Sequence, residues 1–477
     1  MKIQKTTAGD SAAAISQLPK PLVSPSFLYE PTSVLDPHLT SSPSAAVSVA
    51  ASATGGELPV VGGLSCCPSS FAIPAGDDWP EPISWLLSEN PCSDIEYTAS
   101  FFSDLSQFPS LPPAPVAPED QADLLLRAAS SVECGDLNSS HAILARLNLL
   151  LPFPSGGPFN RAVFHFKDAL LCFLSNADRP ACEPPLSASE LVRRIASHKA
   201  FCDLSPIPQF TSFTANQTLL EALAGTCGNS LHLIDFDFGL GYQWSSFVQE
   251  LAARSRATRV TPPSIRVTAV VAGETIETAL AGENLRDFGR GIGVRITVEF
   301  AKVGGLNQIR LAVGETVGVV LSPAIFRLVG ISVLKWVRRA APRVVAFVDT
   351  ECVDGGGCSF RRKFAGVLEQ YVAIMESLEA GAAEGAGEEA VRRIERAVLR
   401  PRIFAAVAAA ASAGEWRDMM AAGGMAAAEL SEFTEVQADL LLRRSPTEGF
   451  HVARREGSMV LSWRGRELAA TSAWRCF

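Results

Sequence analysis

The hydrophobic positions of the chain change their spacing near residue 228, and the two spacings predict two kinds of structure. Between residues 119 and 227, apolar residues recur every three or four positions, as in "EDQADLLLRAASSVECGD", which is the period of an amphipathic helix. Four more stretches repeat this pattern: "SSHAILARLNLLLP", "NRAVFHFKDALLCFL", "LSASELVRRIASHKAFCDL" and "FTANQTLLEALAG". We therefore predict five consecutive helices that form a leucine-rich helical cap over residues 119–227.

Over residues 228–477, short apolar runs alternate with helical stretches. The runs are "LHLIDFDF", "SIRVTAVVA", "VRITVEF", "TVGVVLS" and "RVVAFVDT". This alternation predicts a parallel sheet with helices on both faces. Near the C-terminus, "FHVARRE" and "SMVLSWRG" meet at Gly457 and predict an antiparallel hairpin. The predicted fold class is therefore α/β, with a Rossmann-like core that resembles S-adenosylmethionine-dependent methyltransferases, an α-helical cap and an N-terminal extension.

The N-terminal extension, residues 1–118, has a different composition. It holds 17 of the 31 prolines, and three basic residues against eleven acidic ones. So many prolines interrupt helices and strands, and too few apolar residues remain to offset chain entropy, so we predict an acidic, disordered region. Within it, the stretch Asp77–Phe108 alternates acids with aromatic residues. That pattern is typical of a segment that stays solvated until it binds a groove on a partner protein, although a simple linker remains an alternative.

Composition adds limits on function. No apolar run reaches the roughly 20 residues of a membrane helix, and the N-terminus lacks the apolar core of a signal peptide, so we expect a soluble protein that is not secreted. The eleven cysteines form no C-x-x-C pair, which favours reduced thiols over zinc or disulfides. Most of the net charge of −9 lies in the N-terminal extension, so the nearly neutral remainder favours weak or indirect contact with DNA.

The stretch "LHLIDFDFGLGYQW" holds the strongest candidate for a cofactor site. Gly239 and Gly241 have the spacing of nucleotide-binding turns, but the third glycine is missing from both common patterns. In G-x-G-x-x-G, Trp244 takes the last place. In D-x-G-x-G-x-G, which would begin at Asp237, Gln243 takes it. We therefore predict a vestigial turn at Asp237, Gly239 and Gly241, with no cofactor and no metal.

Other marks of an enzyme are weak. The second strand ends in "AVVAGE", where Glu274 is the one acid that could hold a ribose, and "LSPAIF" offers Ser322 but no Asn or Asp before its proline. The sequence has no G-x-S-x-G, P-loop or H-E-x-x-H motif. Asp235, Asp237 and Asp349 lie at strand ends, where acids can be catalytic but more often cap helices. His232 lies in an apolar strand and is expected in the core.

Three motifs, which follow one another along the chain as "FTANQTLLEA", "LHLIDFDFGLGYQW" and "TSAWRC", resemble the GRAS family of plant transcriptional regulators. "LHLIDFDFGLGYQW" resembles its VHIID signature, "FTANQTLLEA" its preceding helical segment, and "TSAWRC" its closing S-A-W motif, with "ENLRDF" in between. The resemblance covers residues 119–477. The positions that carry it are Asp235, Asp237, Gly239, Gly241, Gln243, Trp244, Ser472 and Trp474. Because Trp474 follows the predicted hairpin, we expect its ring to pack against the sheet.

A narrower resemblance is to the hairy meristem branch of this family, the scarecrow-like proteins. It rests on "FLYEPTSVLDP", "AILARLN", the D-F-D-x-G-x-G-x-Q-W form of the signature and the C-terminal "GFHVARREGSMVLSWRGRELAATSAWRC". The chain departs from the branch at "EAGAAEGAGEEA" and in the short, alanine-rich region from "PRIFAAV" to "GEWRDMM". These departures leave the expected fold intact but put surface contacts there in doubt.

The resemblance implies a nuclear, non-enzymatic transcriptional co-regulator that serves as a protein-interaction scaffold in plant development, specifically in meristem maintenance. The implied partners are transcription factors such as WUSCHEL-related homeodomain proteins, and other GRAS-like proteins. Binding to a membrane is not expected. Partner binding would map to the first helical region, Glu119–Leu204, and its leucine density suggests a face with Leu124, Leu125, Leu147 and Leu150. The alternative is a methyltransferase-fold protein that binds a small molecule, or a methyltransferase.

Overall fold

The computed structural model describes residues 118–175, 187–224, 230–351, 359–382, 387–411, 416–445 and 447–477. The predictions for the N-terminal extension, including the stretch Asp77–Phe108, concern residues outside these ranges, apart from Pro118. None of the helices in the described ranges combines the length and the apolarity needed to cross a lipid bilayer.

The predicted parallel strands form half of one large mixed sheet. They are β1 (Ser230–Asp235), β2 (Ser264–Val271), β3 (Ile296–Lys302), β4 (Thr316–Leu321) and β5 (Val344–Asp349). The order across the sheet is β3-β2-β1-β4-β5-β9-β8-β7, and the first five strands are parallel. The order reverses between β1 and β4, which is where ligands bind in open α/β sheets.

The antiparallel half contains the predicted hairpin and two strands that were not predicted. β7 (Phe450–Arg455) and β8 (Ser458–Trp463) form the hairpin. The strand beside β5, however, is β9 (Arg466–Cys476), which runs antiparallel to β5 and also pairs with β8 and with the short β6 (Met425–Ala428). Both β6 and β9 are rich in alanine, which has low strand propensity. The arrangement confirms the methyltransferase-like fold class.

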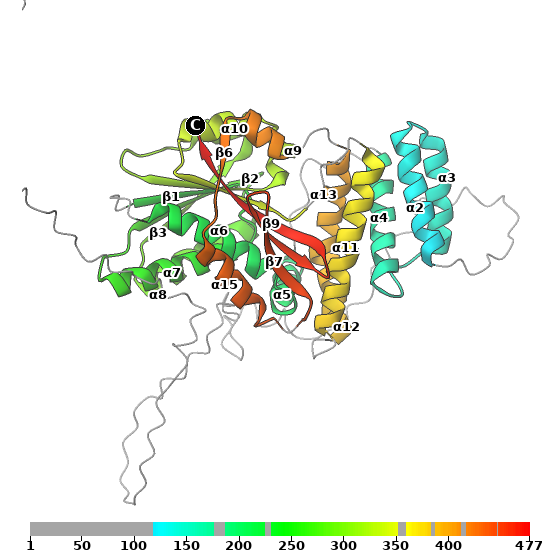
Figure 1. The fold of residues 1–477 in the computed structure, drawn as a ribbon, viewed down its shortest axis with the longest axis horizontal. Coiled ribbons are helices and arrows are strands. Elements are labelled where there is room, and N and C mark those ends of the chain that lie inside the picture. Colours follow the sequence, from blue (N-terminus) through cyan, green and yellow to red (C-terminus); the bar gives the residue numbers. More distant parts are fainter. Residues whose placement is uncertain are drawn as a thin grey trace, which may run out of the picture.

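Helices cover both faces of the sheet, and the strands separate two hydrophobic cores. Because side chains alternate along a strand, Leu233 of β1 faces one core and Ile234 the other. One face is covered by α6 (Ile207–Leu223), α7 (Tyr242–Thr258) and α8 (Ile276–Ile292), and α15 (Glu432–Leu442) packs on α6 and β7. The other is covered by η2 (Val303–Gln308), α9 (Pro323–Val329), α10 (Ser332–Ala340) and α14 (Trp416–Ala422) (Figure 1).

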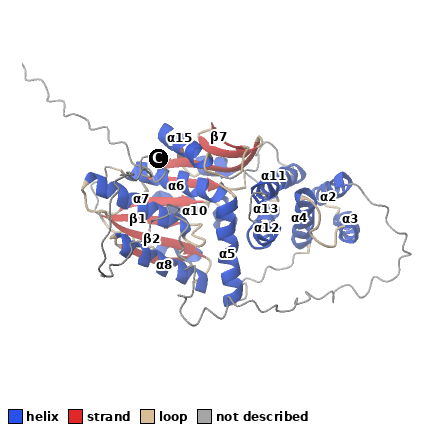
Figure 2. Ribbon diagram, turned by 90° about the horizontal axis from the view of Figure 1, so that it is seen from below, coloured by secondary structure: helices blue, strands red, loops and turns tan. Residues whose placement is uncertain are grey.

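The helical cap is not built from residues 119–227 alone. The five predicted helices are present as α2 (Pro118–Glu133), α3 (Leu137–Leu150), α4 (Pro158–Leu174), α5 (Ala188–Leu204) and α6. Yet α6 packs on the sheet, while later segments join α2 and α4 in the cap: α11 (Phe360–Ala382), α12 (Gly387–Ile394), the π-helical turn η3 (Glu395–Leu399) and α13 (Arg400–Ala410) (Figures 1 and 2). The cap therefore draws on both sides of the predicted boundary at residue 227.

Helix starts in the cap follow local side-chain chemistry. Asp136 caps α3 by accepting a hydrogen bond from the amide of Ser139. Ser187 and Glu190 form a reciprocal capping box at the start of α5. Such caps satisfy amides that have no partner within the helix. The α2–α3 hairpin packs on α4 and α11 and lies at the end of the molecule away from the sheet (Figure 2).

Candidate functional site

The glycine turn joins the carboxyl end of β1 to the start of α7. Gly239 and Gly241 have φ angles of 50° and 70°, in the left-handed region that favours glycine. Gly241 is the residue before the first turn of α7, which begins at Tyr242. The structure thus contains the strand–turn–helix unit in which α/β proteins bind nucleotides, at the point where the strand order reverses.

A side chain of the protein itself lies against this turn. A Cβ added to Gly241 would lie 2.8 Å from Cζ of Phe238. The Phe238 ring is buried and meets Phe300 of β3 edge to face, with the ring centroids 6.1 Å apart. The missing side chain at Gly241 therefore makes room for a ring of this chain. At Gly239, by contrast, an added Cβ would meet no described atom within 4 Å.

Both carboxylate oxygens of Asp235 accept hydrogen bonds from nearby groups. Oδ1 accepts from the amide of Asp237 at 2.8 Å, and Oδ2 accepts from the indole Nε1 of Trp244 at 2.8 Å. Asp235 and Trp244 are buried. Burial raises the pKa of Asp235 to about 7, although these two donors oppose the rise. Asp235 therefore holds the turn and the first turn of α7 together.

The same arrangement recurs at the end of β5. Oδ1 of Asp349 accepts from the amide of Glu351 at 2.8 Å, and Oδ2 accepts from Nε1 of Trp416 at 2.9 Å. The half-buried Trp416 ring stacks on Phe347, with centroids 4.0 Å apart. The expectation of helix capping is therefore corrected for Asp235, whose carboxylate binds an indole and a turn amide, and Asp349 makes the same two kinds of contact.

Burial, and to a lesser extent the charges of Asp349 and Asp237, raise the pKa of Glu351, so these three carboxylates lie near one another. Asp237 and Glu274 are exposed, and the buried hydroxyl of Ser322 has no hydrogen-bond partner among the described residues. Glu351 pairs with Arg327 of α9 at 2.7 Å. In the described part of the chain, no three His, Cys, Asp or Glu side chains are placed to hold a metal ion.

His232 lies in the core, as expected from its place in an apolar strand. It is fully buried, with Nε2 at 2.8 Å from Oγ1 of Thr268 and Nδ1 at 3.1 Å from Nη2 of Arg266. Burial, and then the charge of Arg266, lower its pKa to about 4. His232 is therefore neutral at physiological pH and joins β1 to β2.

The three motifs that stand out in the sequence meet around α6. Nδ2 of Asn216 donates to the carbonyl of Gln243 at 3.1 Å. Oγ1 of Thr214 donates to Oγ1 of Thr471 at 2.7 Å. The motif segments of α6, α7 and β9 are thus linked by direct hydrogen bonds. The side-chain Nε2 of Gln243 is buried and has no partner among the described residues.

The closing motif is buried beside the sheet. Trp474 is 6% exposed, lies in β9 and meets the Trp416 ring edge to face at 6.1 Å. Its Nε1 donates to Oγ of Ser472 at 2.9 Å. The burial expected for Trp474 is therefore present: the residue lies opposite Val345 of β5 and belongs to the core against which Trp416 packs.

Most of the leucines expected on a partner-binding face lie in the interior. Leu125 and Leu147 are fully buried and Leu124 is nearly so, because they form the stripe by which α2 and α3 pack on each other and on α4. Leu150 is partly buried. The outward apolar side chains were missed by sequence reasoning: Leu137 is 47% exposed, Leu149 81% and Phe153 72%. A helical projection of α3 places Leu149 away from Leu144 and Leu147, and this signal could have separated them.

The α2–α3 hairpin also has a surface hollow. It is open to solvent, has a volume of about 470 Å³, and lies between the two helices toward their connecting turn. Its lining residues are Arg127, Ser130, Ser131, Ser139, Ala142 and Ile143. Small side chains on both helices leave this space, and the exposed Arg127 gives it a positive charge.

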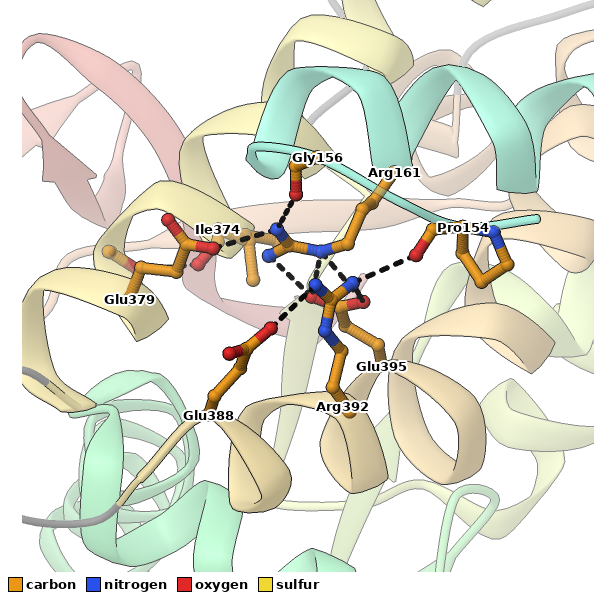
Figure 3. A network of polar contacts seen from close by, with 9 residues as sticks. Pro154, Gly156, Arg161, Ile374, Glu379, Glu388, Arg392 and Glu395 are labelled. Atoms are coloured by element: carbon orange, nitrogen blue, oxygen red, sulfur yellow. Dashed lines mark hydrogen bonds and ion pairs between the residues drawn. The ribbon is translucent and has the colours of Figure 1, made fainter. Parts of the chain in front are cut away.

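The loop between α3 and α4, residues 151–157, is fixed by three cationic side chains. Each donates to one loop carbonyl: Lys167 to Leu151 at 2.7 Å, Arg392 to Pro154 at 3.0 Å, and Arg161 to Gly156 at 2.7 Å. Figure 3 shows the Pro154 and Gly156 contacts. The side chains of Arg161 and Lys167 are only 1% and 2% exposed. The loop is therefore held from within the helical cap.

A buried ion pair supports this arrangement. Nη2 of Arg161 lies 2.8 Å from Oε1 of Glu395, and Nη1 lies 2.7 Å from Oε1 of Glu379 (Figure 3). Glu395 begins the π-helical turn η3, so α4 is tied to the chain between α12 and α13. Breaking the buried pair with Glu395 would leave an uncompensated charge, so Glu395 supports the position from which Arg161 donates to the loop.

Comparisons with known proteins give consistent matches. The profile of the GRAS domain family matches residues 121–475. Scarecrow-like protein 15 of Arabidopsis thaliana is 42% identical over 369 residues, which cover 74% of this chain and 74% of that protein. Scarecrow-like protein 6 of the same plant is 34% identical over 377 residues, covering 77% of this chain and 64% of the relative. The crystal structure of SCL7 in Oryza sativa is 26% identical, with a TM-score of 0.58, and covers 76% of this chain and 100% of that one.

Proposed function

The chain belongs to the GRAS domain family of plant transcriptional regulators, and from this premise we propose that it is a nuclear co-regulator that acts without catalysis. It serves as a scaffold that brings other proteins together in complexes controlling development. The resemblance to the hairy meristem branch extends this proposal to meristem maintenance, with WUSCHEL-related homeodomain proteins as partners. Other GRAS-like proteins are further partners, and contact with DNA is mainly indirect.

The observation that carries the non-enzymatic proposal is the use of Asp235 by the protein itself. A catalytic acid or base must reach a proton of the substrate. Both oxygens of Asp235 instead accept from Asp237 and Trp244, and the similar carboxylate of Asp349 accepts from Glu351 and Trp416. The methyltransferase alternative rests on the fold, and a fold does not establish a chemistry.

The proposed partner-binding surface lies on the first helical region. Because Leu124, Leu125 and Leu147 face the interior, the binding role passes to the outward part of this region, where Leu150 is partly exposed and Leu149 and Phe153 are largely exposed. Exposed large apolar side chains on a fixed framework are typical anchors of protein interfaces.

Binding of the full chain to a WUSCHEL-related homeodomain protein tests this proposal. We expect Leu149→Asp and Leu150→Asp to weaken binding by about tenfold or more, since one apolar anchor is worth at least about 1.4 kcal/mol. Val436→Asp is the matched control, because Val436 is 57% exposed on α15, outside the helical cap. Equal binding by all three variants, measured by calorimetry, contradicts the assignment of this surface.

A further inference from the structure

An apolar surface is presented at the C-terminal end of α3 by a framework that cannot adapt easily. Leu149 and Phe153 lie four residues apart, at the end of α3 and in the loop that follows, and are 81% and 72% exposed. Ordering a loop costs conformational entropy. Here Lys167, Arg392 and Arg161 already hold three carbonyls of that loop. A ligand that covers this surface therefore meets a preorganised site, which lowers the cost of binding.

One exposed positive charge, that of Arg146, lies on α3 about one helical turn before Leu149. Helix α3 and the loop, residues 137–157, contain Arg146 and His141, both exposed, and no Asp or Glu. Acids occur on the neighbouring α2 at Glu119, Asp120 and Asp123, near the end of α3, and at Glu133 and the N-cap Asp136, near its start. An acidic ligand is therefore directed across α3 and the loop rather than along α2.

The chain contains a segment with the complementary chemistry. The stretch Asp77–Phe108 has seven Asp and Glu residues and no Lys or Arg. Large apolar residues alternate with these acids, as in "ISWLLSE" and "FFSDLSQF". Acidic segments of this kind bind when a surface supplies apolar contacts and positive charge together.

The covalent connection brings this segment to the surface. Helices α2 and α3 are antiparallel neighbours, with Oγ of Ser140 donating to the carbonyl of Ala128 at 3.1 Å, so the start of α2 at Pro118 lies beside the end of α3. Nine residues, "PSLPPAPVA", separate Phe108 from Pro118. At about 3.1 Å per residue in an extended polyproline conformation, they span roughly 28 Å. A tether this short gives a local concentration on the order of millimolar.

We propose that the segment Asp77–Phe108 docks within its own chain on the surface formed by Leu149, Phe153 and Arg146. Its aromatic and aliphatic side chains cover Leu149 and Phe153, and its carboxylates lie near Arg146. One consequence rests on the proposed function: the docked segment then occupies the partner-binding surface, and a partner must displace it. The protein then carries an internal competitor for its own partners.

Photo-crosslinking in the full chain tests the docking without any partner protein. Phe153 is replaced by p-benzoylphenylalanine, and cross-linked peptides are identified by mass spectrometry. The control probe replaces Val436, which is also exposed but lies on α15. We expect cross-links from position 153 into residues 77–108 and few from position 436. Arg146→Glu should lower the yield at position 153 by roughly tenfold, as expected for the loss of about 1.4 kcal/mol.

The outcomes are distinct. Equal capture of residues 77–108 by both probes, or no capture at position 153, overturns the docking. A mixture of isotopically light and heavy chains identifies cross-links between two copies, and these would overturn docking within one chain. Loss of capture in Trp85→Ser combined with Leu86→Ser, with unchanged thermal stability, supports it. The cross-linking experiment contains no homeodomain protein, so a negative result there does not affect the proposed function. A negative result in the partner-binding experiment likewise does not affect the docking.

Discussion

Asp235 and Trp244 are joined by a hydrogen bond of 2.8 Å from the indole Nε1 to Oδ2, across the glycine turn between β1 and α7. The bond fixes the position of a buried ring that also contacts Phe247 edge to face. Phe238 also lies against Gly241, so side chains of the chain itself pack on this turn. Asp349 and Trp416 form the same kind of hydrogen bond at the end of β5.

Removal of the indole donor should therefore destabilise the protein. In Trp244→Phe, Oδ2 of Asp235 is left buried without a partner, at a cost of about 1–3 kcal/mol. Trp416→Phe is the matched comparison, because Trp416 is half-buried and water can reach the site more easily. We expect a larger loss of unfolding free energy for Trp244→Phe, measured by denaturant titration. If Trp244→Phe loses no more unfolding free energy than Trp416→Phe, the hydrogen bond between Asp235 and Trp244 is not the more stabilising of the two.

The two turn glycines should differ in their tolerance of alanine. Both have positive φ, so each substitution is strained by roughly 1 kcal/mol. Gly241→Ala also places a Cβ 2.8 Å from the Phe238 ring, whereas the Cβ of Gly239→Ala has no described atom within 4 Å. Thermal melting should show the larger decrease for Gly241→Ala. If the clash is the cause, adding Phe238→Leu should recover part of that decrease, and no recovery would exclude this cause.

The closing motif should contribute mainly to stability. Trp474 is buried against Trp416 and beside β5, and truncation of such a ring typically costs about 3–5 kcal/mol. We expect Trp474→Ala to lower soluble yield and melting temperature together, while Arg475→Ala, at an exposed neighbouring position, changes neither. Normal stability of Trp474→Ala with selective loss of one partner would make Trp474 an interface residue instead.

The stability of the protein should depend on pH through a buried histidine of α4. Neither ring nitrogen of His165 has a hydrogen-bond partner among the described residues. Burial, and then the charges of Arg400, Arg161, Arg392 and Lys167, lower its pKa from 6.5 to about 4. Between pH 4 and 6.5 the unfolded chain binds a proton that the folded chain does not. The contribution of His165 is therefore complete above about pH 6.5 and is lost as the pH falls toward 4.

The variant His165→Phe isolates this contribution. We expect its unfolding free energy to fall less steeply below pH 6.5 than that of the wild type, by up to about 1.4 kcal/mol per pH unit. The two proteins are compared at each pH, because Asp235, with a pKa raised to about 7, contributes with the opposite sign. Identical slopes in the two proteins would rule out His165 as a source of the acid sensitivity.

The glycine turn should bind S-adenosylmethionine poorly. Phe238 lies against Gly241, and the acid that follows the second strand, Glu274, is exposed. Each buried hydroxyl left without a partner costs about 1–3 kcal/mol, so a micromolar affinity would weaken toward millimolar. We expect calorimetry on the full chain to give no saturable isotherm below about millimolar ligand. A clear micromolar isotherm would instead favour the ligand-binding alternative.

The sequence by itself determined the type of each strongly patterned element. Apolar spacing of three and four residues marked the helices from α2 to α6, and short apolar runs marked β1 to β5. These periods are local consequences of backbone geometry, so they can be read without knowing what the element packs against. The same holds for the glycines at 239 and 241, because a positive φ is a property of the turn itself.

Only the tertiary structure decided which elements meet. The position of β9 beside β5 brings an alanine-rich run of low strand propensity into the sheet, and no local pattern marks it. Leu147 and Leu149 are both leucines of α3, yet one is fully buried and the other 81% exposed, because only one face of the helix has neighbours. The hydrogen bond between Thr214 and Thr471 joins residues 257 positions apart. A sequence period shows which residues share a face, but the element that covers that face is selected by packing across the whole chain.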